Sequence, residues 1–276
     1  MAPAPGNTSC RSSCALVGLF TLSIILLGLI FSALARPWLH LSWWKVFRRC
    51  VSISAALSLW LIVTRVERRT LRSYGFFDSA VGKRQFFLGV GLGVASLATL
   101  FAVGLATGNC QLDVTPDRLR LWRTIIGFIP AAVLVGVLEE LTFRGFIFQH
   151  LAVCSKPLAV IASSVAYSLV HLKTRAIDLS SGLELMGLFL LGIVLALSYL
   201  RTRQLYLAVG LHASLAYGAG VNKLLFAFPN PSRAWLTGTS RLVNGLVGWM
   251  VLLAVGGLIV WWRRSSRQGG VDHGNA

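Results

Sequence analysis

The sequence predicts an all-α polytopic membrane protein, a bundle of about eight transmembrane helices, from three observations. Of its residues, 55% are hydrophobic and 13% are charged, whereas a soluble domain carries about 25% charged residues. The mean hydropathy is +0.72. Apolar stretches long enough to cross a bilayer recur along the whole chain. Because they leave no room for a sizeable soluble domain, we expect residues 1–276 to form a single membrane domain.

The apolar stretches follow one another with short polar or basic connections between them. The expected spans are 14–35, 50–65, 85–107, 122–150, 157–175, 183–201, 204–226 and 243–262. After the last span, the polar stretch 265–276 has no apolar periodicity, and we expect it to be a disordered tail. The five cysteines show no spacing that is typical of a disulfide framework or a metal site.

A net charge of +17 is concentrated beside the apolar spans. Arg68 and Arg69 follow one span, and Arg263 and Arg264 follow another. Basic connections of this kind contact anionic lipid headgroups and fix the orientation of a membrane protein. We therefore expect membrane lipids as partners and no nucleic acid. The densest basic cluster, 65–84, predicts that both termini lie in the cytoplasm.

The fourth span ends in an unusual acidic pair, Glu139 and Glu140, followed by Arg144. Only nine of the 276 residues are acidic, and a carboxylate removed from water costs several kcal/mol unless it is paired or neutralised. On a helix, Glu140 and Arg144 lie one turn apart on one face and can form an ion pair. Glu139 is rotated by about 100° from Glu140 and needs a different partner. A purely structural ion pair explains Glu140 and Arg144 but not Glu139.

Two histidines in later spans can supply that partner. His171 lies late in the fifth span, and His212 lies early in the seventh. Counting from the span ends that share one membrane face, Glu139, His171 and His212 lie at depths of roughly 16, 21 and 12 Å. The sequence therefore predicts that all three side chains line one cavity within the bilayer.

The residue spacing within these spans forms a series of motifs. Glu139, Glu140 and Arg144 make the pattern Glu-Glu-x-x-x-Arg, and Tyr167 and His171 make an aromatic residue followed four positions later by histidine. Each motif alone is weak, whereas their order along the chain and their placement in membrane spans are more specific.

A third motif completes the series. A glycine-containing span, 192–202, ends in a Leu-Arg-Thr turn and precedes His212. Together the motifs resemble the CAAX protease and bacteriocin-processing (CPBP) family of intramembrane proteases, which includes the CAAX prenyl endopeptidases. The resemblance covers roughly residues 120–230, which would form the catalytic core. One position departs from the family pattern: four residues after the histidine the family usually has asparagine, and this chain has Ala216.

The resemblance implies an endopeptidase that hydrolyses a peptide bond near the membrane surface. Glu139 would be the general base, His171 would orient the attacking water, and His212 would stabilise the tetrahedral oxyanion. Glu140 and Arg144 would support the site, and Arg144 could also hold a peptide carboxylate. The implied partner is a peptide or protein substrate, and the expected location is a bacterial inner (plasma) membrane.

Two other functions stay open, the first of them because of the alanine at position 216. Loss of one oxyanion donor typically costs about 10²–10³ in rate, and Ser214, Tyr217 or a backbone amide would have to replace the missing amide. The alternative is a non-catalytic relative that acts as a membrane scaffold or immunity protein. A third hypothesis is an ion or small-solute carrier that uses the buried glutamate and histidines as a proton relay.

The use of a metal is a separate question. Glu139, His171 and His212 resemble the three protein ligands of a catalytic zinc site, which would make the protein a metalloprotease-like hydrolase. The sequence lacks the His-Glu-x-x-His pattern of soluble zinc proteases, and glutamate-activated water needs no metal, so we favour a mechanism without zinc. Two further polar residues, His150 and Glu184, are expected to be interfacial.

Overall fold

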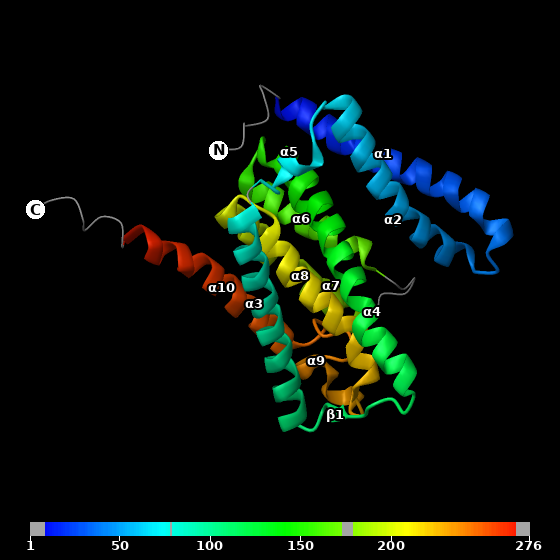
Figure 1. The fold of residues 1–276 in the computed structure, drawn as a ribbon, viewed down its shortest axis with the longest axis vertical. Helices are drawn as coiled ribbons and strands as arrows, with labels where there is room; N and C mark the ends of the chain where they lie inside the picture. Colours follow the sequence, from blue (N-terminus) through cyan, green and yellow to red (C-terminus); the bar gives the residue numbers. More distant parts are fainter. Residues whose placement is uncertain (1–8, 78, 173–178, 269–276) are drawn as a thin grey trace, which may run out of the picture.

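A computed structural model of the chain describes residues 9–77, 79–172 and 179–268, and most of them are helical (Figure 1). The helices are α1 (Cys10–Ala35), α2 (Trp43–Leu61), α3 (Ser79–Ala106), α4 (Arg118–Glu140), α5 (Phe148–Ala152), α6 (Lys156–Val170), α7 (Leu179–Thr202), α8 (Tyr206–Val221), α9 (Ala234–Thr237) and α10 (Leu246–Gln268). Wider π-helical turns, Ile62–Val66 and Leu141–Ile147, extend α2 and join α4 to α5. Short 3₁₀ turns lie at Arg36–Trp38, Leu71–Tyr74, Asn222–Leu224 and Pro231–Arg233. Two short strands, β1 (Gln111–Leu112) and β2 (Phe226–Ala227), pair antiparallel.

Five helical segments are long and apolar enough to cross a membrane, so the chain is a multi-pass integral membrane protein. These segments are Cys10–Trp38, Trp43–Val66, Ala80–Ala106, Arg118–Ala152 and Leu179–Thr202. The prediction of about eight spans is not confirmed. The other three expected spans fold as helices α6, α8 and α10, but α6 has 15 residues and α8 has 16, fewer than the roughly 20 that a bilayer requires.

Helix α8 is the central element of the bundle, and it packs against α3, α4 and α7 (Figure 1). Nine consecutive residues of α8, 207–215, are buried. Glycines allow α3 and α8 to approach closely: a Cβ on Gly89 would lie 2.3 Å from the carbonyl oxygen of Leu207, and one on Gly210 would lie 2.1 Å from that of Phe86. This close approach fixes the position of His212, two residues after Gly210.

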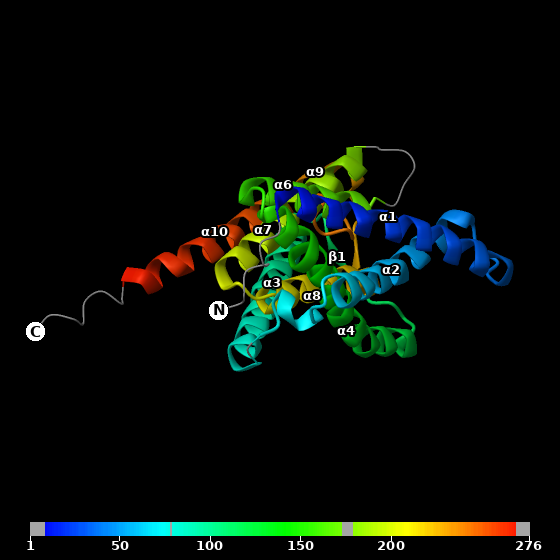
Figure 2. The same ribbon diagram turned by 90° about the horizontal axis from the view of Figure 1, so that it is seen from above.

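Helices α1 and α2 form a hairpin that projects from one side of the bundle, while α10 projects from the other (Figures 1 and 2). A disulfide between Cys10 and Cys154 ties the hairpin to the connection between α5 and α6. The spacing of the cysteines in the sequence gave no indication of this disulfide, because its two partners are 144 residues apart and the fold alone brings them together. The thiol of Cys14 lies 3.7 Å from the Cys154 sulfur.

A second contact holds the hairpin against the core. Glu67, directly after the π-helical turn of α2, accepts a hydrogen bond from the Tyr74 hydroxyl and lies 3.0 Å from Nε2 of His150. The side chain of His150 is 5% exposed. The expectation that His150 is only an interfacial residue was wrong, since a carboxylate from α2 supplies a buried partner that its own neighbours in the sequence do not.

The C-terminal helix is longer than its apolar stretch. Helix α10 continues to Gln268, so the first four residues of the predicted disordered tail, 265–268, are helical. The remainder of that tail lies outside the described residues.

Candidate active site

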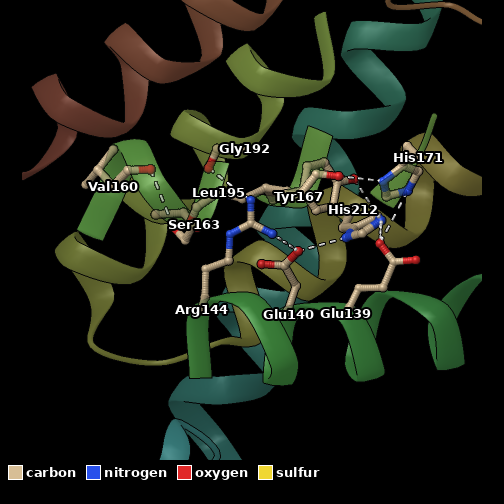
Figure 3. Close-up of polar contacts among 11 residues, drawn as sticks. Glu139, Glu140, Arg144, Val160, Ser163, Tyr167, His171, Gly192, Leu195 and His212 are labelled. Carbon is tan, nitrogen blue, oxygen red and sulfur yellow. Dashed lines mark hydrogen bonds and ion pairs between the residues drawn. The ribbon is translucent and has the colours of Figure 1, made fainter. Parts of the chain in front are cut away.

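The acidic pair lies where the winding of the fourth span changes. Asp117 begins α4 by accepting a hydrogen bond from the backbone of Arg120 at 2.9 Å, which satisfies one of the unpaired amides at the helix start. The helix ends at Glu140, and the π-helical turn that follows carries Arg144. Turns of this kind occur frequently at functional sites. Figure 3 shows Glu139, Glu140 and Arg144 on this element, facing the two histidines and Tyr167.

Glu140 is the centre of a buried polar network. Its Oε1 accepts hydrogen bonds from Nη1 of Arg144 at 2.9 Å and from Nδ1 of His212 at 2.8 Å. The side chains of Glu140 and Arg144 are both 0% exposed. Removing two opposite charges from water is tolerated when they are paired and hydrogen-bonded. The predicted ion pair is present, and it also orients His212.

Arg144 has no surface available to a substrate. Its Nη2 donates to the carbonyl oxygen of Gly192 at 3.0 Å, and its guanidinium lies over the ring of Tyr167 at 4.7 Å. The suggestion that Arg144 holds a peptide carboxylate does not fit this arrangement, because the group is fully buried. Arg144 instead connects α4, α6 and α7.

Glu139 faces both histidines, as its rotation from Glu140 requires. Its Oε2 lies 3.5 Å from Nε2 of His171 and 3.7 Å from Nε2 of His212. Glu139 and His171 are 30% and 24% exposed, whereas His212 is 5% exposed. Three side chains from α4, from the end of α6 and from α8 thus meet at one point (Figure 3). One side of this cluster is open and the other is buried.

The hydrogen bonds of the two imidazoles determine where their protons lie. Nδ1 of His171 is 2.8 Å from the carbonyl oxygen of Tyr167, and Nδ1 of His212 is 2.8 Å from the Glu140 carboxylate. Both partners are acceptors, so each Nδ1 must carry the hydrogen. In a neutral imidazole the remaining Nε2 is then an acceptor. Both Nε2 atoms point at the Glu139 oxygen, which is buried and receives no hydrogen bond from the described residues.

Two of the replacements considered for Ala216, the hydroxyls of Ser214 and Tyr217, donate hydrogen bonds elsewhere. Ser214 donates to the carbonyl oxygens of Gly210 and Leu211 within its own helix. Tyr217 donates to the carbonyl oxygen of Ile125 at 3.1 Å. Neither hydroxyl is directed at the Glu139 cluster, so neither replaces the missing asparagine.

The zinc alternative meets a geometric obstacle. Ligands around a tetrahedral zinc bond at about 2.0–2.2 Å and so stand close to one another. Among the described residues, the set that brings three possible ligand atoms within 4.8 Å of one another is Cys10, Cys14 and Cys154, two of which form the disulfide. Glu139 Oε2 lies 3.5 and 3.7 Å from the two Nε2 atoms, but the three ligand atoms together do not meet this spacing. Zinc binding by these residues stays a prediction for metal analysis of the purified protein.

Two polar partnerships could not be read from the sequence. The bond between Glu140 and His212 joins residues 72 positions apart, and the only available signal was their similar depth. Glu184 forms an ion pair with Arg241 and its side chain is 10% exposed, while its expected place at the membrane interface stays a prediction. Its partner follows the seventh predicted span, which gave no indication of the pairing.

Comparison with known proteins identifies one family. Residues 121–218 match the model of the family described as Type II CAAX prenyl endopeptidase Rce1-like. The matched segment contains the acidic pair, Arg144, Tyr167 and both histidines. Comparisons with curated proteins and with solved structures found no match. The match confirms the resemblance to CAAX proteases.

Proposed function

We propose that this chain, which carries a type II CAAX prenyl endopeptidase-like segment over residues 121–218, is an intramembrane endopeptidase. The observation that supports this best is the Glu139 carboxylate, faced by the Nε2 atoms of His171 and His212 at 3.5 and 3.7 Å. A carboxylate oxygen that is buried and receives no hydrogen bond from the described residues, beside the acceptor Nε2 of His171, is suited to bind and deprotonate water.

The attack step follows from the positions of these acceptors. A water molecule between them would donate one hydrogen to Glu139 Oε2 and the other to Nε2 of His171. Glu139 takes the first proton as the water oxygen bonds to the scissile carbonyl carbon. The electron pair of the carbonyl double bond moves onto its oxygen, which becomes an oxyanion. His171 holds the water in position, since its own ring is fixed by the Tyr167 carbonyl.

The second half of the reaction returns the proton. The oxyanion reforms the carbonyl double bond, the carbon–nitrogen bond breaks, and the proton held by Glu139 passes to the leaving amine. His212 is the stabilising residue when it is an imidazolium, because its Nε2–H then donates to the oxyanion. Two glutamates, Arg144 and a charged His212 together sum to zero charge, which favours that state in a buried site.

The substrate class is part of the proposal. The matched family is described as a prenyl endopeptidase, so the first probe is an internally quenched peptide with an S-farnesylated cysteine four residues from its C-terminus. The same peptide without the farnesyl group tests whether the lipid is needed. We place the scissile bond near the surface of a bacterial inner membrane. The proposed mechanism uses no metal; zinc remains a separate prediction for metal analysis of the purified protein.

The test compares the wild-type protein, purified and reconstituted in lipid vesicles, with Glu139→Ala, His171→Ala and His212→Ala. We expect wild-type cleavage of the farnesylated peptide and loss of cleavage in all three variants. His40→Ala is the matched control, because His40 is exposed in the connection between α1 and α2. Wild-type cleavage in all three site variants would overturn the assignment.

The alternative function, a non-catalytic scaffold or immunity protein, is favoured by Ala216. It predicts that the wild-type protein cleaves neither peptide and that its cellular phenotype survives Glu139→Gln. The peptidase proposal predicts that cleavage and phenotype are lost together in that variant.

A further inference from the structure

The peptidase proposed above needs a second donor for the oxyanion, and one hydroxyl is well placed to supply it. The Tyr167 hydroxyl lies 3.4 Å from Nε2 of His212, and the Tyr167 ring is 1% exposed. We propose that the Tyr167 hydroxyl donates a hydrogen bond to the oxyanion and so replaces the amide that is absent at Ala216. This inference rests on the proposed function and adds a catalytic residue to it.

The tyrosine ring is held in place from several sides. The guanidinium of Arg144 lies 4.7 Å from its centre, and the edge of Phe143 packs against it with ring centres 5.3 Å apart. The rings of His171 and His212 lie 4.7 and 5.7 Å from it. A donor that is fixed before reaction stabilises a developing charge without the cost of reorganisation.

The Tyr167 hydroxyl hydrogen is free to bind the oxyanion when the oxyanion forms. The contact with His212 is long, since a well-formed hydrogen bond to a hydroxyl is about 2.8 Å. When His212 is an imidazolium, its Nε2–H is a donor, and Tyr167 cannot donate to it. The hydroxyl hydrogen then points elsewhere, and the oxyanion is the acceptor that forms beside it. Tyr167 and His212 would thus form a pair of donors.

The geometry of α8 explains why Tyr167 can stand in for asparagine. Ala216 lies four residues after His212, on the same helical face. An asparagine at that position would direct its amide toward the region beside His212. Alanine has no such donor, so the hydrogen bond would come from Tyr167 on the facing helix, α6. The structure therefore predicts that the two donors are interchangeable.

The experiment measures kcat and KM for the farnesylated quenched peptide in vesicles. Its variants are Tyr167→Phe, Ala216→Asn, the double variant of both, and Glu139→Gln. Tyr167→Phe removes only the hydroxyl, and we expect it to lower kcat by about 10²-fold with little change in KM. In the double variant we expect kcat to recover by at least about tenfold relative to Tyr167→Phe, as a restored donor should give. Thermal unfolding of each variant confirms that it is folded.

The outcomes separate this inference from the proposed function. If Glu139→Gln abolishes cleavage while Tyr167→Phe retains wild-type kcat, Tyr167 is not a donor and only this inference fails. If Tyr167→Phe is impaired and Ala216→Asn gives no recovery, Tyr167 only positions His212, and the oxyanion role is overturned. If the wild type is inactive or Glu139→Gln keeps its activity, the proposed function fails and this inference fails with it.

Discussion

At the scale of single residues, the Glu140 carboxylate connects the structural and chemical parts of the site. It holds the buried charge of Arg144 on one side and the Nδ1 hydrogen of His212 on the other. The second contact resembles the way a buried aspartate fixes the tautomer of a catalytic histidine. Glu139 and Glu140 are adjacent in sequence, yet Glu139 faces the two histidines and Glu140 holds Arg144 and His212.

The first prediction concerns the charge of Glu140. Glu140→Gln leaves the fully buried Arg144 without its carboxylate, and removal of one member of a buried ion pair typically costs about 3–5 kcal/mol. We expect a clear fall in the free energy of unfolding, measured by thermal or chemical unfolding in detergent. The double variant Glu140→Gln/Arg144→Gln should lose less than the sum of the two single variants. Strict additivity would show that the pair is not coupled.

The sequence was informative about those residues whose partners lie nearby along the chain. The pairing of Glu140 with Arg144 follows from helical periodicity, and the structure shows it at 2.9 Å. Depth along the spans also suggested that Glu139, His171 and His212 lie in one layer. The depth of a residue along its span does not determine how the helix is rotated about its axis, however. The Glu140–His212 bond and the position of the Tyr167 hydroxyl could therefore not be predicted. Both depend on how α4, α6 and α8 turn toward one another.

At the scale of helices, the contact between α3 and α8 sets the position of His212. Gly89 on α3 lies directly against the backbone of α8, where an added Cβ would be 2.3 Å from the Leu207 carbonyl oxygen and 2.8 Å from the Leu211 nitrogen. Backbone atoms cannot rotate away as a side chain can. A methyl group at this position must therefore push the helices apart.

The prediction at this scale compares Gly89→Ala with Gly91→Ala. We expect Gly89→Ala to destabilise the protein by about 1–3 kcal/mol, as overpacking typically does. It should also lower peptide cleavage, because small displacements of catalytic groups can cost about 10²-fold in rate. A Cβ on Gly91 meets none of the described residues within 4 Å, so Gly91→Ala should match the wild type in both measurements. Equal behaviour of the two variants would contradict the role given to this helix contact.

The lengths of the helices explain where the sequence was a poor guide to the spans. Hydropathy identified an apolar stretch at every long helix. It did not identify where α6 ends: the helix stops at Val170, with His171 as its C-cap, whereas the expected span continued to 175. Helix α8 is buried among other helices and carries glycines, His212 and a serine, so it needs no lipid-facing surface of its own. An apolar stretch can therefore be an internal helix of the bundle and not a full span.

At the scale of the whole molecule, two contacts dock the α1–α2 hairpin onto the rest of the helix bundle. One is the disulfide between Cys10 and Cys154, and the other is the cluster of Glu67, Tyr74 and His150. These contacts connect segments separated by as many as 144 residues. Spacing of cysteines in the sequence could not indicate them, because the pairing depends on the complete fold.

The prediction at this scale concerns the cysteines. In protein purified without reductant and treated with an alkylating agent, peptide mass spectrometry should find Cys10 joined to Cys154. The Cys14 sulfur lies 3.7 Å from Cys154, so in Cys10→Ser we expect Cys14 to replace Cys10 in the cross-link. Cys154→Ser should remove both cross-links. An unlinked Cys154 in the wild-type protein would contradict the observed docking of the hairpin.

We propose that Glu139 is the base of a peptidase within the membrane. The most direct measurement is kcat for the farnesylated quenched peptide in wild-type protein and in Glu139→Gln, reconstituted in the same vesicles. Glutamine keeps the size of the side chain but cannot accept the proton from water. Because a general base typically contributes about 10²–10⁴-fold, we predict a fall in kcat of that order with unchanged thermal stability. Cleavage by Glu139→Gln at the wild-type rate would contradict the account.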